Sequence, residues 1–214
     1  MKTLFIEAKA DIDISQLSNK VKDNIKYGLI TTIQHLHQLK EINQKLSKSV
    51  IGGQVLGCNV SNAVKIKDKV DAFLFIGSGT FHPLEIALRT GKGVYQFNPY
   101  INKISIISNS EIDNRKRRIK GTYLKYLNSK VIGLIVSTKK GQNNLKSALE
   151  FKQKSDKEIY IFVADNIDLQ SLENFPQVEC WINTACSRIA LEDYDKFNKP
   201  IINLSDLKSQ EINQ

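Results

Sequence analysis

The 214-residue chain lacks any long hydrophobic run. No stretch approaches the ~18 uninterrupted apolar residues that a membrane-spanning helix requires, so no membrane segment is predicted. The first residues contain an acidic side chain at Glu7 and do not have the pattern of a signal peptide. The sequence therefore predicts a cytoplasmic protein that does not associate with a membrane.

Cysteine is scarce, with only three residues in the whole chain. Three thiols do not form a disulfide framework, and in a reducing compartment cysteines serve as metal ligands, catalytic groups or buried apolar residues. Neither Cys58 nor Cys186 has a companion at zinc-finger spacing. Cys180 falls within an apolar run, which predicts a buried core thiol.

Histidine is also scarce. His35 and His37 are predicted to open a helix and to lie at the surface or in a cap. His82 stands beside a glycine-rich loop, where it could face a ligand. A zinc site that mixes cysteine and histidine ligands remains an alternative at this point.

Acidic residues are fewer than basic ones, 22 against 31, which gives a net charge of +9. This surplus favours an acidic or nucleic-acid partner, but it also fits the lysine-rich bias of an AT-rich genome. Five cations fall close together between Arg115 and Lys120 on a predicted helix. They form either a solvated face or a docking surface, and without interleaved aromatic residues RNA recognition is not favoured.

Apolar strand patterns alternate with amphipathic helix patterns along the whole chain. This alternation predicts an α/β fold with mainly parallel sheets, in two similar units of residues 1–110 and 111–214. The predicted strands are Thr3–Glu7, Tyr27–Thr32, Ala72–Ile76, Val94–Phe97, Ile104–Ile107, Val131–Ser137, Ile159–Val163, Cys180–Asn183 and Lys199–Leu204. The predicted helices are Ile14–Asn24, Gln34–Ser47, a short one from Ser61, Pro83–Arg89, Glu111–Leu127, Leu145–Gln153 and Leu169–Phe175.

Glycines and polar residues follow directly after four of the apolar strands. Parallel sheets bind ligands at the carboxyl ends of their strands, so this distribution predicts a ligand site there, between the two units. The four segments are Gly77-Ser78-Gly79, Ser137–Gln142, Asp165-Asn166 and Asn183–Cys186.

Two cysteines lie in segments of this kind. Cys58 follows the run Gly52–Gly57, which is expected to be a glycine-rich loop. A thiol on such a loop before a helix tends toward the metal-binding thiolate. Cys186 follows a strand and small residues, and Arg188 next to it is a cation that could steady negative charge. We therefore expect Cys58 and Cys186 to be metal ligands.

Five segments resemble the archaeal diphthamide-synthase family, in order and over nearly the whole chain. They are Gly53–Cys58, Gly77–Leu84, Val136–Gln142, Asp165-Asn166 and Asn183–Cys186. The resemblance implies three similar α/β domains that each give one cysteine to a [4Fe–4S] cluster. It also implies that the cluster cleaves S-adenosylmethionine to a 3-amino-3-carboxypropyl radical, which is added to a histidine of elongation factor 2.

Carried over to this sequence, the resemblance makes Cys58 and Cys186 the cluster ligands of the second and third domains. It implies that S-adenosylmethionine is bound by residues from both units, namely Gln54, Gly77, Gly79, His82, Lys140, Gly141, Gln142 and Asp165. Ser187 stands where the family has a proline. The family's first domain, with its cysteine, has no counterpart in the chain.

Three functions remain open from the sequence. The chain is expected to be one part of a multi-chain transferase, in which another chain gives the first domain and the third cysteine. Alternatively, it is a non-catalytic accessory subunit paired with a homologous subunit, for electron delivery or for docking of elongation factor 2. A basic, nucleic-acid-associated α/β protein without a cluster is the third alternative.

Overall fold

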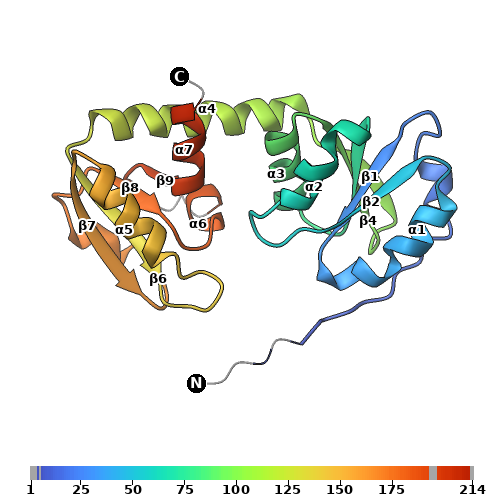
Figure 1. The fold of residues 1–214 in the computed structure, drawn as a ribbon, viewed down its shortest axis with the longest axis horizontal. Coiled ribbons are helices and arrows are strands. Elements are labelled where there is room, and N and C mark those ends of the chain that lie inside the picture. The colour runs from blue at the N-terminus through green and yellow to red at the C-terminus, as the bar shows by residue number, and fades with distance from the viewer. Residues whose placement is uncertain (1–3, 5, 193–196, 213–214) are drawn as a thin grey trace. The chain divides into compact units, whose positions relative to one another are not determined.

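The computed structural model describes residue 4, residues 6–192 and residues 197–212, without the side chains of residues 211 and 212. It consists of two compact units, Met1–Asp113 and Asn114–Gln214. Both combine helices with a mainly parallel sheet, as Figure 1 shows, which confirms the predicted α/β class. The predicted boundary between residues 110 and 111 falls in the same helix, α4 (Asn109–Asn128), as the boundary between these units.

The first unit is built on a five-stranded sheet of order β2-β1-β3-β4-β5. Only β5 runs antiparallel, in a hairpin with β4. The strands are β1 (Tyr27–Thr31), β2 (Ser49–Gln54), β3 (Ala72–Ile76), β4 (Gly93–Asn98) and β5 (Lys103–Ile106). The helices are η1 (Ser18–Lys20), η2 (Ile33–Gln38), α1 (Leu39–Lys45), α2 (Ser61–Ile66), η3 (Lys67–Lys69) and α3 (Phe81–Thr90).

The second unit is built on a four-stranded, fully parallel sheet of order β7-β6-β8-β9. Its strands are β6 (Val131–Ser137), β7 (Glu158–Ala164), β8 (Cys180–Asn183) and β9 (Ile201–Asn203). Its helices are α5 (Leu145–Lys154), η4 (Ser171–Asn174), α6 (Arg188–Leu191) and α7 (Leu204–Ile212), together with most of α4. In the described part of the chain, no helix is both long and apolar enough to cross a bilayer.

Each sheet is covered on both faces, which is why β1, β3 and β8 are buried along their whole length. In the first unit, α1 covers one face, and α2 and α3 cover the other. In the second unit, α4, α5 and α7 share one face, while η4 and α6 pack around Trp181 on the other. These two-sided cores fix the strand ends from which the candidate site residues extend.

Two predictions at the start of the chain are wrong. The described part of Thr3–Glu7 is not a strand, and Leu4 and Ile6 are exposed; Thr3 and Phe5 lie outside the described residues. The predicted helix Ile14–Asn24 is reduced to the single turn η1. Ser15 donates its amide to Asp13 Oδ1 at 2.8 Å, one of the local bonds by which short polar side chains compete with a helix.

The glycine-rich segment before Cys58 is largely a strand instead of the predicted loop, since β2 includes Gly52 and Gly53. A Cβ at position 52 would lie 2.4 Å from Ile30 Cδ1 and 2.8 Å from Ile66 Cδ1, so a side chain there would have to displace core side chains. Gly53, with a φ of 99°, adjoins a shift in the β1–β2 register. Likewise, the predicted helices Gln34–Ser47 and Leu169–Phe175 are partly or wholly 3₁₀ turns.

Candidate functional site

Cys58 lies at the tip of a tight turn that follows β2. Leu56 and Asn59 exchange backbone hydrogen bonds of 3.3 and 3.0 Å, so Gly57 and Cys58 are the two residues at the turn. Gly57 has a φ of 57°, a conformation that favours glycine. Asn59 then accepts the Ser61 amide at 3.1 Å at the start of α2. The Cys58 thiol is therefore exposed on a turn whose backbone is fixed on both sides.

The glycine loop after β3 is held from beneath by one buried side chain. Gln96 on β4 donates its amide to the carbonyl oxygens of Gly77 and Gly79, at 3.0 and 2.9 Å. A side chain added at Gly79 would meet nothing within 4 Å, and its φ of 76° also favours glycine. The loop therefore exposes a bare backbone that a ligand can approach closely. Gln96 was not predicted as a site residue.

Gln54 and His82 lie at the same end of this sheet. Gln54 is the last residue of β2, and its carbonyl accepts the Asn62 side chain at 2.8 Å. His82 is half-buried at the start of α3, and its ring stacks on Phe75 with the centroids 5.7 Å apart. Since β1, β2 and β3 are parallel neighbours, the predicted residues Gln54, Gly77 and Gly79 share the carboxyl edge of one sheet.

Cys186 follows β8 on a short loop that a buried network of amides fixes. Asn183 Nδ2 donates to the Cys186 carbonyl at 2.9 Å, while Asn183 Oδ1 accepts the Ala185 amide at 3.1 Å. The Thr184 hydroxyl donates to the Ile135 carbonyl of β6 at 2.7 Å. Both Asn183 and Thr184 are buried, so these bonds hold the loop in one conformation and leave the thiol half-exposed.

A second strand end supports this network. Asn203, the last residue of β9, donates to the Ser187 carbonyl at 3.2 Å and to Asp206 Oδ2 at 3.1 Å. Asp206 is itself buried on α7. Neither residue was predicted, although a polar residue that ends an apolar strand is a signal that could have pointed to Asn203.

The predicted residues Lys140, Gly141, Gln142 and Asp165 lie on two adjacent loops at the same sheet edge. Thr138, after β6, donates its hydroxyl to Asp165 Oδ1, after β7, at 3.1 Å. The Gln142 amide donates to the Lys139 carbonyl at 3.0 Å, and Gly141 between them has a φ of 80°. These loops are exposed and mostly polar, apart from half-buried Gln142.

The third cysteine does not belong to the site. Cys180 is fully buried in the second core, and this burial raises the pKa of its thiol to about 12. Such a thiol stays protonated and is a poor metal ligand, so the prediction of a core cysteine is confirmed. Arg188, expected to steady negative charge, forms an ion pair with Glu192 one turn along α6.

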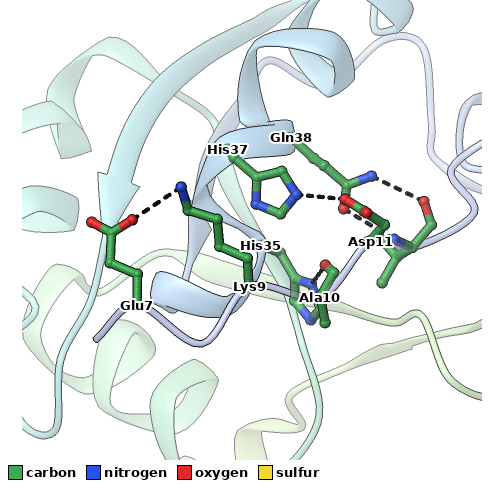
Figure 2. A network of polar contacts seen from close by, with 8 residues as sticks. Glu7, Lys9, Ala10, Asp11, His35, His37 and Gln38 are labelled. Atoms are coloured by element: carbon green, nitrogen blue, oxygen red, sulfur yellow. Dashed lines mark hydrogen bonds and ion pairs between the residues drawn. The ribbon is translucent and has the colours of Figure 1, made fainter. Parts of the chain in front are cut away.

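Of the three histidines, one departs strongly from its prediction. His35, expected at the surface or in a cap, is fully buried, and its Nδ1 lies 2.9 Å from the Ala10 carbonyl oxygen, as Figure 2 shows. His37 contacts Asp11 at 2.7 Å. Both rings therefore fasten the N-terminal segment. The mixed Cys/His zinc alternative gains no support, since no three His, Cys, Asp or Glu residues group closely enough for a metal among the described residues.

Each unit contains one thiol that could bind an iron–sulfur cluster. Iron–sulfur clusters are held by cysteine thiolates, and each unit presents one accessible thiol on a strand-end loop, Cys58 or Cys186. These residues fit two ligand positions. The predicted sharing of one site by both units stays a prediction.

The family model for diphthamide synthesis proteins matches residues 1–209. The chain belongs to the diphthamide synthesis family. It is 36% identical to the 2-(3-amino-3-carboxypropyl)histidine synthase of Pyrococcus horikoshii, over 94% of this chain and 63% of that protein. The protein of the same name from Methanocaldococcus jannaschii is 34% identical, over 97% of this chain and 62% of the relative. The chain thus spans less than two thirds of the length of these diphthamide synthesis proteins.

Structural similarity agrees with this membership. A crystal structure of Dph2 from Pyrococcus horikoshii with a 4Fe–4S cluster superposes with a TM-score of 0.73 and 32% identity, over 88% of this chain and 58% of that one. A family relative from Caenorhabditis elegans, 26% identical over 93% of this chain and 54% of its own length, is named as subunit 1 of the synthase.

Proposed function

We propose that this chain is part of a diphthamide synthase that transfers a 3-amino-3-carboxypropyl group from S-adenosylmethionine to a histidine of elongation factor 2. In this proposal, Cys58 and Cys186 are two of the three protein ligands of a [4Fe–4S] cluster. Membership of the diphthamide synthesis family supports the reaction, and the cluster in the Dph2 relative supports the cofactor.

The distribution of the three thiols is the observation that carries the proposal. Cys58 and Cys186 are accessible on fixed loops at the carboxyl edges of two similar sheets, whereas Cys180 is enclosed in a core. A structural cysteine gains nothing from such a loop, because burial is what stabilises a small apolar side chain. Two accessible thiols with braced backbones are instead suited to metal ligation.

The bound cluster would supply the electron and the coordination site for cleavage of S-adenosylmethionine. The chain's own residues would bind and orient that cofactor. We assign this role to the bare loop Gly77–Gly79 with Gln54 and His82, and to the polar loops that contain Lys140, Gly141, Gln142 and Asp165. Gln96 and Asn183 would act as positioning residues, since they hold the loops from beneath.

The third ligand is proposed to come from outside residues 1–214, because Cys180 is unsuited to the role. We propose that a second chain supplies it, together with the domain that carries it. The naming of eukaryotic relatives as subunit 1 supports a multi-chain enzyme.

A transfer assay tests the proposed reaction. The chain is combined anaerobically with its candidate partner chain, iron, sulfide, a reductant, S-adenosylmethionine and unmodified elongation factor 2. Mass spectrometry is expected to find the 3-amino-3-carboxypropyl group on one histidine. Cys58→Ala and Cys186→Ala should abolish the transfer, and Cys180→Ala should retain it. Transfer that survives both loop-cysteine variants would contradict the proposed function.

An accessory role is the second candidate, and it is favoured by the naming of eukaryotic relatives as one subunit of the synthase. An accessory subunit would bind its partner without being required for cleavage. Two results would favour that role. With excess reductant, the partner chain alone should transfer the group as fast as the two chains together. With limiting reductant, addition of this chain should raise the rate.

A further inference from the structure

The solvent-facing side of α4 bears a group of exposed residues. Arg117, Lys120, Gly121 and Leu124 follow the i, i+3, i+4, i+7 spacing of one helix face, and all four are exposed. Lys116 and Leu127 flank them on the same side. We call these six residues the α4 face.

The α4 face carries three cations, and the exposed carboxylate of Asp113 lies one turn before Arg117 on the same helix. Lys116 and Lys120 are one turn apart, as are Arg117 and Lys120, and like charges at these spacings destabilise a helix. Among the residues that the structure describes, no carboxylate forms an ion pair with any of the three cations. A surface of this kind gains most from an acidic partner.

Gly121 is an independent anomaly on the same face. It lies in the interior of a 20-residue helix, where glycine is less favourable than alanine. Its backbone is not in the left-handed region, and an added Cβ would meet no atom within 4 Å. Neither backbone geometry nor packing against the described residues therefore requires glycine at position 121. Close approach by another molecule would require it.

The bare backbone at Gly121 borders a hollow of about 320 Å³ that is also lined by Arg118, Lys125 and Lys199. Lys199 is held in place by bonds to three carbonyl oxygens, and Arg118 by bonds to two. Lys125 forms no ion pair with any described carboxylate. Lys125 is therefore the cation of this hollow that can attract an acidic side chain next to the α4 face.

We infer that the α4 face and its hollow dock an acidic, partly apolar surface of a protein, and that this protein is the elongation factor substrate. The identity of the protein rests on the proposed function. Leu124 and Leu127 are 50% and 44% exposed and would gain nothing from a phosphate backbone. The aromatic residues of α4, Tyr123 and Tyr126, are buried and unavailable for base stacking, so a protein fits this face better than RNA does.

The test measures binding of purified, unmodified elongation factor 2 to the full chain assembled with its partner chain and cluster. Arg117→Glu/Lys120→Glu is expected to weaken binding at least about tenfold and to reduce its salt dependence. Gly121→Leu should weaken binding to a similar degree, although it raises the midpoint temperature of unfolding. Lys146→Glu/Lys152→Glu, which makes the same charge change on exposed positions of α5, should bind as wild type.

Three results would overturn the docking inference. Equal affinity of wild type, the charge-reversal variant and Gly121→Leu would show that the α4 face is not the contact. Single-stranded RNA can be tested as a competitor of the elongation factor for binding. If RNA binding requires Arg117 and Lys120 but is unchanged in Gly121→Leu, the α4 face would be a nucleic-acid site. Absence of factor binding by wild type would also overturn it. The iron content of the same samples tests the proposed function separately.

Discussion

The side chains of Asn183 and Asn203 meet at the ends of two adjacent strands, with Asn183 Nδ2 2.7 Å from Asn203 Oδ1 and both residues buried. Asn183 in turn binds the carbonyl of Cys186, and Asn203 binds that of Ser187. The loop that presents the thiol is thus held by the same pair of amides that joins β8 to β9.

Asn183→Ala should lower the free energy of unfolding by about 2 kcal/mol, since it leaves buried acceptors and donors without partners. It should also loosen the Cys186 loop, so that a chelator removes iron faster from the reconstituted protein. Urea unfolding and the rate of iron loss measure the two effects. The matched control is Asn198→Ala, which removes an exposed amide and should change neither. Wild-type rates of iron loss in Asn183→Ala would contradict the bracing role.

Gln96→Leu should disorder the Gly77–Gly79 loop, because it removes both bonds that hold the loop from beneath. We expect weaker binding of S-adenosylmethionine, by about tenfold or more, with cluster content unchanged. Equilibrium dialysis measures the affinity. Gln153→Ala, at an exposed end of α5, serves as the control. Unchanged affinity in Gln96→Leu would remove the glycine loop from the proposed cofactor site.

Cys180 gives a prediction in alkali. Burial raises the pKa of its thiol to about 12, so the folded state retains a proton that the unfolded state releases above about pH 9. The contribution of this thiol to stability is therefore complete below about pH 9 and is lost as the pH rises toward 12. Wild type should lose more unfolding free energy than Cys180→Ala over this interval. Parallel stability curves for the two proteins would contradict the assignment.

The buried ring of His35 should anchor the N-terminal segment seen in Figure 2. A carbonyl oxygen can only accept a hydrogen bond, so His35 Nδ1 donates to the Ala10 carbonyl. The Ala10 amide in turn donates to the Gln34 carbonyl at 2.9 Å. His35→Ala should cost roughly 3 kcal/mol through the cavity and the lost bond. It should also speed amide hydrogen exchange at Ala10 and Ile12. His37→Ala, at a partly exposed ring, should have a much smaller effect; equal effects would contradict this account.

Gly121→Ala should stabilise α4 by about 1 kcal/mol, because alanine is the better helix former and open space surrounds the position. Thermal unfolding provides the measurement. Gly133→Ala is the contrasting variant: there a Cβ would lie 2.4 Å from the Trp181 ring, so destabilisation is expected. A loss of stability in Gly121→Ala would mean that the fold itself requires this glycine.

The sequence was most informative where a strand is buried on both faces. Ala72–Ile76, Val131–Ser137 and Cys180–Asn183 were predicted with the bounds that the structure has, because continuous apolar runs of this length are typical of central parallel strands. The edge strand β2 was missed, since its two adjacent glycines resemble a loop. Only the structure shows that Ile30 closely approaches Gly52, which leaves little room for a side chain there.

The sequence pointed to site loops that lie next to their strands in the chain. It did not point to the side chains that hold these loops from other parts of the chain. The glycine loop and the Cys186 loop follow predicted strands directly and could be found from the pattern. Cys58 was singled out by its glycine-rich surroundings alone. Gln96 and Asn203 act on residues 16 to 19 positions away, in loops that follow neighbouring strands, so only the sheet order brings them together. His35 was misplaced because its partner, Ala10, lies in a segment with no regular structure.

The most direct test of the account is anaerobic reconstitution with iron and sulfide in the presence of the candidate partner chain, followed by electron paramagnetic resonance after reduction. The account predicts a [4Fe–4S] signal that Cys58→Ala and Cys186→Ala each weaken severely and that Cys180→Ala retains. A wild-type protein that takes up no iron with its partner, or a signal that survives loss of both loop cysteines, would contradict it.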